Sequence, residues 1–295
     1  MDRILLTGAT GFIGQALLRA WQGTGEIAVL TQSGPSAKGL GLSPKVIFKD
    51  PEAAAAFKPT IVVHLAGAGI AEARWTAKRR AKLWASRVDY TRRLVNALRP
   101  APPERMIAAS AIGYYGPLGD SPVDESAPRG AGFAAALCEA WEAESRALKA
   151  GGSAVCCLRL GLVLGPHGGL LGRLAPPFRL GLGGRIGAGA QGMSWIHRDD
   201  VLSLLSWLRA APILPETVNG TAPHPVSNGE FTQALGQALR RPTPFPLPAA
   251  LVKILFGQMG QELLLGGAIV LPRVAETAGF PFRFPTLSEA LEDIF

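Results

Sequence analysis

The first half of the chain alternates short apolar runs with longer segments in which apolar residues recur every three or four positions. The short runs predict buried strands, and the longer segments predict amphipathic helices between them. Strands and helices that alternate in this way form βαβ units, so we predict an α/β fold with a doubly wound parallel sheet. The expected strands are residues 4–6, 27–30, 61–65, 106–109 and 155–160, and the expected helices are residues 14–21, 76–98 and 133–149.

The pattern changes after residue 165. Residues 165–192 are rich in glycine and carry few regular signals, which predicts an irregular loop of the kind that often lines a ligand pocket. From residue 212 prolines punctuate the chain, and one clear helix is expected at 227–239 with Asn228 as its N-cap. We therefore predict a first domain of residues 1–211 and a smaller C-terminal lobe of residues 212–295 that closes over the sheet edge.

The composition favours a folded domain over a disordered chain. Of the 295 residues, 48% are hydrophobic and 18% are charged, and the net charge is +8, so a substantial core can form. A charge run usually marks a solvated helix face, and the alternative is that one or two of its members contact ligand phosphates. Nucleic acid is not an expected partner, because metal-finger spacing and aromatic residues beside basic strips are both missing. The densest basic run is Arg74, Lys78, Arg79, Arg80, Lys82, Arg87, Arg92 and Arg93.

Cysteine and histidine usage predicts a reducing compartment and no metal site. Cys138, Cys156 and Cys157 offer no disulfide framework and are expected to be packing residues. The four histidines show no metal-ligand spacing. The apolar runs are too short or too interrupted to cross a bilayer, and the first strand begins too early to leave room for a signal peptide. We expect a cytoplasmic protein with no membrane contact.

A glycine-rich run directly follows the first expected strand and opens the first expected helix. It reads Thr7-Gly8-Ala9-Thr10-Gly11-Phe12-Ile13-Gly14. In this context Gly8 permits a tight turn, Gly11 lets the backbone approach a pyrophosphate, and Gly14 lets the helix pack closely on the strand. Free N–H groups at the positive end of the helix then face the diphosphate. The run therefore predicts a nicotinamide dinucleotide in a Rossmann-type domain.

The end of the second strand bears on the choice between NADP and NAD. NAD-binding domains of this type usually carry Asp or Glu there to bond the ribose hydroxyls. This chain instead has Thr31, Gln32 and Ser33, none of which would repel a 2′-phosphate. The missing acid favours NADP, whereas the missing arginine keeps NAD as the alternative.

Longer runs carry a family resemblance over nearly the whole chain. They are LAGAGI at 65–70, RWT at 74–76, SAIGYYG at 110–116, RLGLVLG at 159–165, PFRLGLGG at 177–184, SWIHRDD at 194–200 and the tail at 270–291. These runs resemble atypical extended short-chain dehydrogenase/reductases, namely the YfcH-like epimerase family that includes family 39U, together with its characteristic C-terminal segment.

The resemblance implies a Rossmann domain that binds NADP. The family commonly has arginine where this chain has Gln32, which implies a weaker hold on the 2′-phosphate. Arg87 can supply the missing charge because a guanidinium fork fits phosphate oxygens, and its alternative role is a surface ion pair. The implied contacts are Gly8, Thr10, Gly11, Phe12, Ile13, Gly14, Thr31, Gln32, Leu65, Ala66, Gly67, Arg87 and Ser110.

The acid/base pair usual in this family is absent. Ordinary members use a Tyr and a Lys four residues later on one helix face, where the ammonium lowers the phenol pKa. At the matching helix this chain has Phe133 and Leu137, which cannot transfer a proton. Three polar residues remain as candidates for the pocket, and each has a structural alternative as a strand-end cap, a core-edge aromatic or a helix-start group. They are Ser110, Tyr115 and His197.

Two hypotheses of function follow. The first is an NADP-binding oxidoreductase-like or epimerase-like enzyme that acts on an unidentified small molecule. The second is a non-catalytic dinucleotide sensor or interaction protein, a class that fits the cell-division-inhibitor labels of some relatives. The sequence names neither the substrate nor the oligomeric state.

Overall fold

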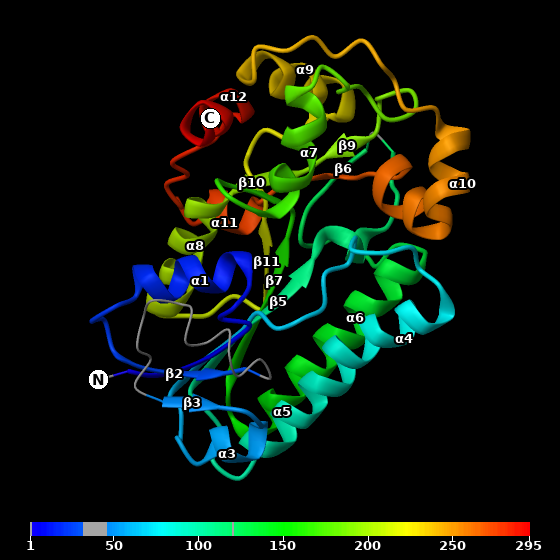
Figure 1. Ribbon diagram of the computed structural model, residues 1–295. Coiled ribbons are helices and arrows are strands. Elements are labelled where there is room, and N and C mark those ends of the chain that lie inside the picture. Colours follow the sequence, from blue (N-terminus) through cyan, green and yellow to red (C-terminus); the bar gives the residue numbers. More distant parts are fainter. Residues whose placement is uncertain (1, 32–45, 120) are drawn as a thin grey trace.

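The centre of the molecule is a seven-stranded sheet whose strands all run parallel. The computed structural model describes residues 2–31, 46–119 and 121–295. The strand order is β3-β2-β1-β4-β5-β7-β11, so the sheet grows in opposite directions from β1 and β4 (Figure 1). The predicted Rossmann-type doubly wound fold is confirmed. The strands are β1 (Arg3–Thr7), β2 (Glu26–Leu30), β3 (Val46–Phe48), β4 (Ile61–His64), β5 (Arg105–Ala111), β7 (Ala154–Leu160) and β11 (Thr217–Gly220).

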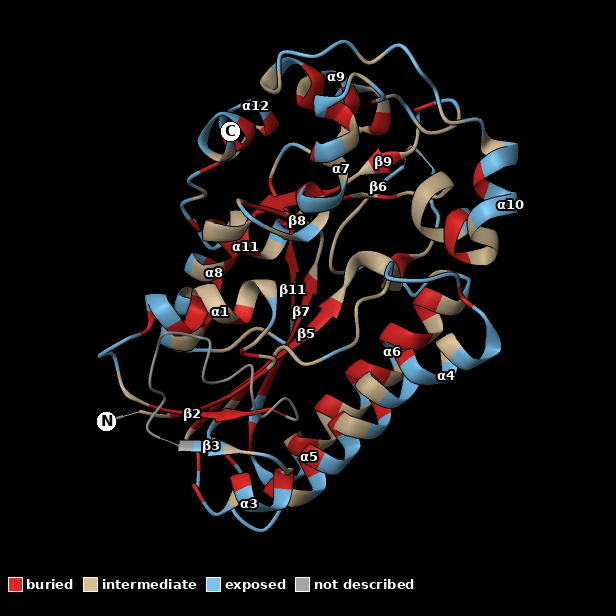
Figure 2. Ribbon diagram, in the orientation of Figure 1, coloured by how far each residue is buried: buried red, intermediate tan, exposed pale blue. Residues whose placement is uncertain are grey.

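Helices cover both faces of this sheet. On one face the buried leucines of two helices, Leu17 and Leu18 with Leu204 and Leu205, pack on the strands. Each such side chain contributes roughly 1.5–3 kcal/mol by leaving water. Figure 2 shows the buried strands between the two helical layers. The helices are α1 (Phe12–Ala20), α8 (Arg198–Ala210) and α11 (Arg273–Thr277) on this face, and α3 (Pro51–Ala55), α5 (Tyr90–Leu98) and α6 (Phe133–Arg146, continued by η3, Ala147–Gly151) on the other.

The long basic helix expected at 76–98 forms, but a π-helical turn divides it. The parts are α4 (Ala77–Trp84), η1 (Ala85–Asp89) and α5. Arg92 pairs with Glu144 at 2.7 Å and Arg93 with Glu52 at 2.6 Å, and both arginines are about half exposed. The solvated-face interpretation is confirmed for these two residues, and such exposed pairs contribute about 1 kcal/mol at most.

The prediction of an irregular loop over the whole of 165–192 was wrong. Helix α7 (Gly169–Arg179) lies within it, although Pro176 and Pro177 stand inside the helix. An interior proline costs about 3 kcal/mol relative to alanine. The helix forms because Leu171 and Phe178 are buried in the core of the lobe, and the glycines and prolines had hidden this apolar spacing in the sequence.

The remaining elements build a lobe above the ends of β5, β7 and β11 (Figure 1). Its core joins Trp195, Phe231 and Phe284. Ser227, not the expected Asn228, caps α9 through a capping box with Glu230. The elements are α9 (Asn228–Ala238), α10 (Ala249–Met259), η4 (Gly260–Leu265), α12 (Leu287–Ile294) and the short pairs β8 (Leu162–Leu164) with β10 (Trp195–His197), β9 (Gly192–Met193) with β12 (Val226–Ser227), and β6 (Pro122–Val123) with β13 (Ile269–Val270).

The division after residue 211 does not coincide with a structural boundary. Strand β11, which the sequence assigned to the lobe, is the edge strand of the main sheet and pairs with β7. The tail returns to the main domain as well, because the Asp200 carboxylate on α8 accepts hydrogen bonds from the backbone N–H groups of Arg283 and Phe284 at 2.8 and 3.0 Å. The lobe is therefore fastened to the main domain at both of its ends, through β11 in the sheet and through the contact of its tail with α8.

Two further expectations concern the cysteines and the membrane. The three cysteines are buried and unpaired, and burial raises the pKa of Cys138 to about 11 and that of Cys157 to about 12. They are inert packing residues, as predicted. Within the described residues, no helix combines the length and the apolar character that a bilayer span requires.

Candidate functional site

The glycine-rich turn between β1 and α1 leaves no room for a side chain at two of its glycines. Gly8 has a φ of +73°, and a Cβ there would lie 2.6 Å from the carbonyl carbon of Leu65. A Cβ on Gly14 would overlap the carbonyl oxygen of Gly8. The N–H of Gly11 closes the turn on that same oxygen at 3.0 Å. Only glycine fits at Gly8 and Gly14, as the sequence predicted.

The N-terminus of α1 is open to an anion. Its N-cap is Gly11, which offers no side-chain hydrogen bond, and its first turn contains no acidic residue. The unpaired N–H groups and the helix dipole both favour negative charge there. The Phe12 ring points away toward the 165–169 loop, where a Cβ on Gly168 would lie 2.8 Å from it. Phe12 therefore anchors this loop and leaves its backbone free.

A buried relay of hydroxyls and imidazole fixes the neighbouring loop. Thr7 Oγ1 lies 2.7 Å from His64 Nδ1, and His64 Nε2 lies 2.8 Å from Thr91 Oγ1. The Thr7 hydroxyl also accepts the N–H of Ala66 at 3.2 Å. Burial lowers the pKa of His64 to about 4, so the ring is neutral at pH 7. Sequence reasoning missed this role, because the apolar strand around His64 gave no sign of a partner.

Arg87 lies over the backbone of Gly67. A Cβ on Gly67 would be 3.2 Å from Arg87 Cζ, and the guanidinium carbon lies 5.1 Å from the centre of the Trp141 ring. Its Nη1 donates to Ser86 Oγ at 3.5 Å, and no described carboxylate forms an ion pair with it. Burial lowers the pKa of Arg87, although guanidinium remains charged at pH 7. The π-helical turn η1 carries both Ser86 and Arg87 to this position, as such turns often do at functional sites.

The structure thus brings most of the predicted cofactor contacts to one edge of the sheet. Gly8–Gly14 and Leu65–Gly67 touch each other, and Arg87 covers the second loop. Thr31 follows β2 at the same edge, is buried, and donates its N–H to Phe48 O at 3.0 Å. Gln32 lies outside the described residues.

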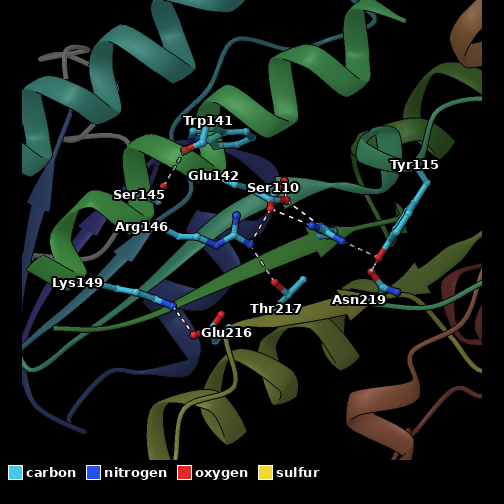
Figure 3. Close-up of polar contacts among 11 residues, drawn as sticks. Ser110, Tyr115, Trp141, Glu142, Ser145, Arg146, Lys149, Glu216, Thr217 and Asn219 are labelled. Atoms are coloured by element: carbon cyan, nitrogen blue, oxygen red, sulfur yellow. Dashed lines mark hydrogen bonds and ion pairs between the residues drawn. The ribbon is translucent and has the colours of Figure 1, made fainter. Parts of the chain in front are cut away.

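A buried polar network lies beside this edge. Ser110 Oγ donates to Glu142 Oε1 at 2.7 Å, and Arg159 forms two hydrogen bonds with the same carboxylate at 2.8 and 3.0 Å. Arg159 Nη1 also donates to the Tyr115 hydroxyl at 2.9 Å, and that hydroxyl donates to Asn219 Oδ1 at 2.8 Å. Figure 3 shows these groups facing one another from α6, the sheet and the short helix η2 (Ile112–Tyr115). The network joins five elements, β5, η2, α6, β7 and β11, around the buried Glu142 carboxylate, which pairs with Arg159 and also with Arg146 at 2.9 Å.

The three polar pocket candidates do not converge on a single point. Ser110 and Tyr115 are 3% and 0% exposed, and their hydroxyls are bound within the network. Burial is the main cause that raises the pKa of Tyr115. His197 is fully buried elsewhere, at the start of α8, where its Nδ1 accepts the N–H of Asp199 at 3.2 Å. These positions agree with the structural alternatives that the sequence left open, namely a polar group at a strand end for Ser110, an aromatic residue of the core for Tyr115 and a helix-start group for His197.

His197 also belongs to a cluster with Asp199 and Asp293, whose ligand atoms lie within 4.8 Å of one another. Because Nδ1 accepts a hydrogen bond, the neutral ring carries its proton on Nε2, which lies 3.5 Å from Asp293 Oδ2. That nitrogen has no lone pair to give to a metal. Arg283 lies 3.9 Å from each of the two carboxylates. The cluster therefore acts as a polar contact that holds α12, which carries Asp293, against the start of α8.

Glu262 stands at the helix where the family carries its Tyr and Lys. It comes from η4 of the lobe, and its two oxygens accept the N–H groups of Phe133 and Ala134 at 3.1 and 2.9 Å. Leu137 is buried. The start of α6 is thus capped by a carboxylate from the lobe. The sequence gave no signal for this contact, which joins residues about 130 positions apart.

The fold and the turn define a dinucleotide-binding Rossmann protein. The family model described as "NAD dependent epimerase/dehydratase family" matches residues 4–219, and a "Domain of unknown function (DUF1731)" matches residues 247–294. The chain belongs to this epimerase/dehydratase family, as the resemblance predicted.

Relatives of known name support the same assignment. Epimerase family protein Mb2239 of Mycobacterium bovis is 39% identical and covers 98% of this chain and 96% of its own. Human epimerase family protein SDR39U1 is 36% identical over 99% of both chains. The crystal structure of human SDR39U1 (isoform 2) with NADPH superposes with a TM-score of 0.89 at 34% identity, covering 99% of this chain and 98% of that one. A nucleoside-diphosphate sugar epimerase from Corynebacterium glutamicum gives a TM-score of 0.77 at 27% identity, covering 98% of this chain and 57% of that one.

We predict that His64 makes stability depend on pH in a defined window. Its pKa falls from the usual 6.5 to about 4 on folding, so between these values the unfolded chain binds a proton that the folded chain refuses. Stability therefore falls as the pH drops from 6.5 to 4, by about 3 kcal/mol in total. The free energy of unfolding, measured in urea at a series of pH values, should fall less steeply with decreasing pH in His64→Asn than in wild type. The same dependence of unfolding free energy on pH in both proteins would contradict this role of His64. So would an NMR titration in which the His64 imidazole takes up its proton above pH 6.

We also predict that Arg159 is needed for folding stability. Arg159→Met leaves the buried Glu142 carboxylate with the partly exposed Arg146 as its one charged partner, which should cost about 3–5 kcal/mol in denaturant unfolding. The double variant Arg159→Met with Glu142→Leu should recover part of that loss, because no charge is then left buried. A double variant that is less stable than Arg159→Met would argue against an electrostatic origin.

Proposed function

We propose that this protein binds NADP(H) at the sheet edge and reduces a small molecule held between the sheet and the lobe. The observation that carries the proposal is the turn Gly8–Gly14 at the open end of α1, where neither Gly8 nor Gly14 has room for a side chain. A diphosphate fits there, because Gly11 is exposed and the nearest atom to a Cβ on it would be Gly8 O at 3.2 Å. Bound NADPH would supply a hydride.

Several groups of this chain would hold the dinucleotide. The N–H groups of Phe12 and Ile13 would face the pyrophosphate, and the Leu65–Gly67 backbone would lie beside the adenosine. Arg87 would reach a phosphate, since it is a half-buried cation with no described acidic partner. Human SDR39U1, crystallised with NADPH, supports NADP over NAD for this chain. The neutral Thr31 at the end of β2 supports the same preference.

We predict that Arg87→Met weakens NADPH binding roughly tenfold, because a charge-assisted hydrogen bond contributes about 1.5–3 kcal/mol. Calorimetric titration measures the affinity directly. Arg93→Met is the matched control, since Arg93 follows on the same helix and pairs with Glu52; it should bind like wild type. Unchanged affinity in Arg87→Met would assign Arg87 to packing against Trp141, and no heat with NADPH or NADP⁺ would remove the proposal altogether.

Turnover separates an enzyme from a sensor. We expect NADPH oxidation, followed at its nicotinamide absorbance, to depend on an added carbonyl compound. NADPH binding without turnover across a broad panel of carbonyl compounds and sugar nucleotides would instead support a dinucleotide sensor.

A further inference from the structure

A cavity of about 260 Å³ lies between the sheet edge and the lobe. Ile70 and Gly113, which follow β4 and β5, line one side, and Leu174, Phe178 and Phe231 of the lobe line the other. Its volume corresponds to roughly nine liquid waters. The cavity therefore adjoins the strand ends at which the proposed cofactor binds, and it has the size of a small ring system.

The polar side chains that line this cavity are already engaged by the protein. Ser194 Oγ donates to Ala268 O at 2.9 Å and accepts the N–H of Val270 at 2.8 Å. Asn228 Oδ1 accepts the N–H of Ile186 at 2.7 Å. The Gln191 amide donates to Ile186 O at 3.0 Å and to Leu264 O at 2.8 Å.

Glu262, the single charged residue that lines the cavity within the described part of the chain, is likewise committed. Glu262 caps α6 and also accepts from Gln258 at 2.8 Å. Thr232 adds one neutral hydroxyl to the lining. The lining thus has few free hydrogen-bonding groups left for a ligand. A ligand that needs several hydrogen bonds would give up its hydrogen bonds to water on entry without replacing them.

No Lys or Arg among the described residues lines the cavity. A sugar nucleotide carries a diphosphate, and burying that charge without a cation is costly. The lining also lacks Tyr, His, Asp and Cys within the described part of the chain. Its one carboxyl group, Glu262, already accepts three hydrogen bonds from the protein, so no lining side chain is placed to protonate a product. A simple ketone would become an alkoxide, a base nearly as strong as hydroxide. A quinone would become an aryloxide, and phenols ionise with a pKa of about 10.

We propose that the cavity takes an uncharged apolar quinone and excludes nucleotide sugars. This inference names the substrate class of the reductase proposed above and rests on that function. The hydride leaves reduced nicotinamide, which becomes oxidised nicotinamide, and forms an O–H bond at one quinone carbonyl. The π pair of that carbonyl moves into the ring, and the π pair of the opposite carbonyl ends on its own oxygen, which gives the hydroquinone monoanion. This anion takes one proton from water and leaves hydroxide, so no protein acid is required.

The test uses 2-methyl-1,4-naphthoquinone as the probe on the full chain, with calorimetry and NADPH oxidation as separate readouts. We expect saturable binding and turnover above the rate without protein. Leu174→Asp places a charge in the lining and should weaken quinone binding at least tenfold while leaving NADPH affinity unchanged. Leu180→Asp is the control, because Leu180 follows the same helix, is 76% exposed and does not line the cavity.

The outcomes are distinguishable. Quinone binding that is insensitive to Leu174→Asp, or absent from wild type, overturns the inference, as does binding of UDP-glucose that the quinone displaces. A naphthyl methyl ketone reduced as fast as the quinone would overturn the argument from the missing acid. A third result would separate the two proposals: NADPH does not bind, but the quinone binds and Leu174→Asp weakens that binding. In that case the proposed reductase function is wrong, whereas the inference that the cavity binds an apolar ligand is supported.

Discussion

The contact between two backbone segments, with no side chain between them, determines the geometry of the whole sheet edge. Gly8 adopts a left-handed backbone, and the Leu65–Ala66 peptide passes at a distance that no Cβ would allow. The Thr7 hydroxyl then fastens Ala66, and His64 fastens Thr7. Because β1 and β4 are neighbours where the sheet reverses its direction of growth, both loops open on the same side. The amide donors are therefore in place before any ligand arrives, which lowers the entropic cost of binding.

The polar groups nearest to this edge face inward and not toward the cavity. In ordinary relatives a tyrosine and a lysine on one helix exchange a proton with the substrate. In this chain the corresponding helix is α6, and its matching residues are the apolar Phe133 and Leu137. The hydroxyls of Ser110 and Tyr115 are bound to Glu142, Arg159 and Asn219. A hydroxyl held in this way, with no access to solvent, stabilises the junction of α6 with the sheet. Acid catalysis by it would require breaking a buried ion-pair network, which is expensive.

The sequence predicted what local chemistry and periodicity determine. The glycine spacing between residues 8 and 14 set the turn, and apolar runs set the order of strands and helices. Contacts between residues that are distant in the sequence could not be predicted in this way. Nothing near Glu262 indicates that its carboxylate caps a helix about 130 residues earlier. Nor could the glycines and prolines of 165–192 reveal that Leu171 and Phe178 would find a core to bury them in α7. Local signals predict elements, whereas tertiary burial decides which of the weak ones form.

The distribution of charge around the two parts of the site has a consequence for specificity. The open end of α1 and Arg87 supply positive charge on the dinucleotide side, while the described lining of the cavity has apolar walls, no Lys or Arg, and polar groups that the protein largely satisfies. An apolar wall discriminates weakly among apolar molecules of similar shape, since one methylene is worth about 1–3 kcal/mol. It discriminates strongly against charge, because desolvation is not repaid. Under the substrate class proposed above, selection in this cleft would work mainly by exclusion, and the protein would accept several related apolar molecules while rejecting anionic ones.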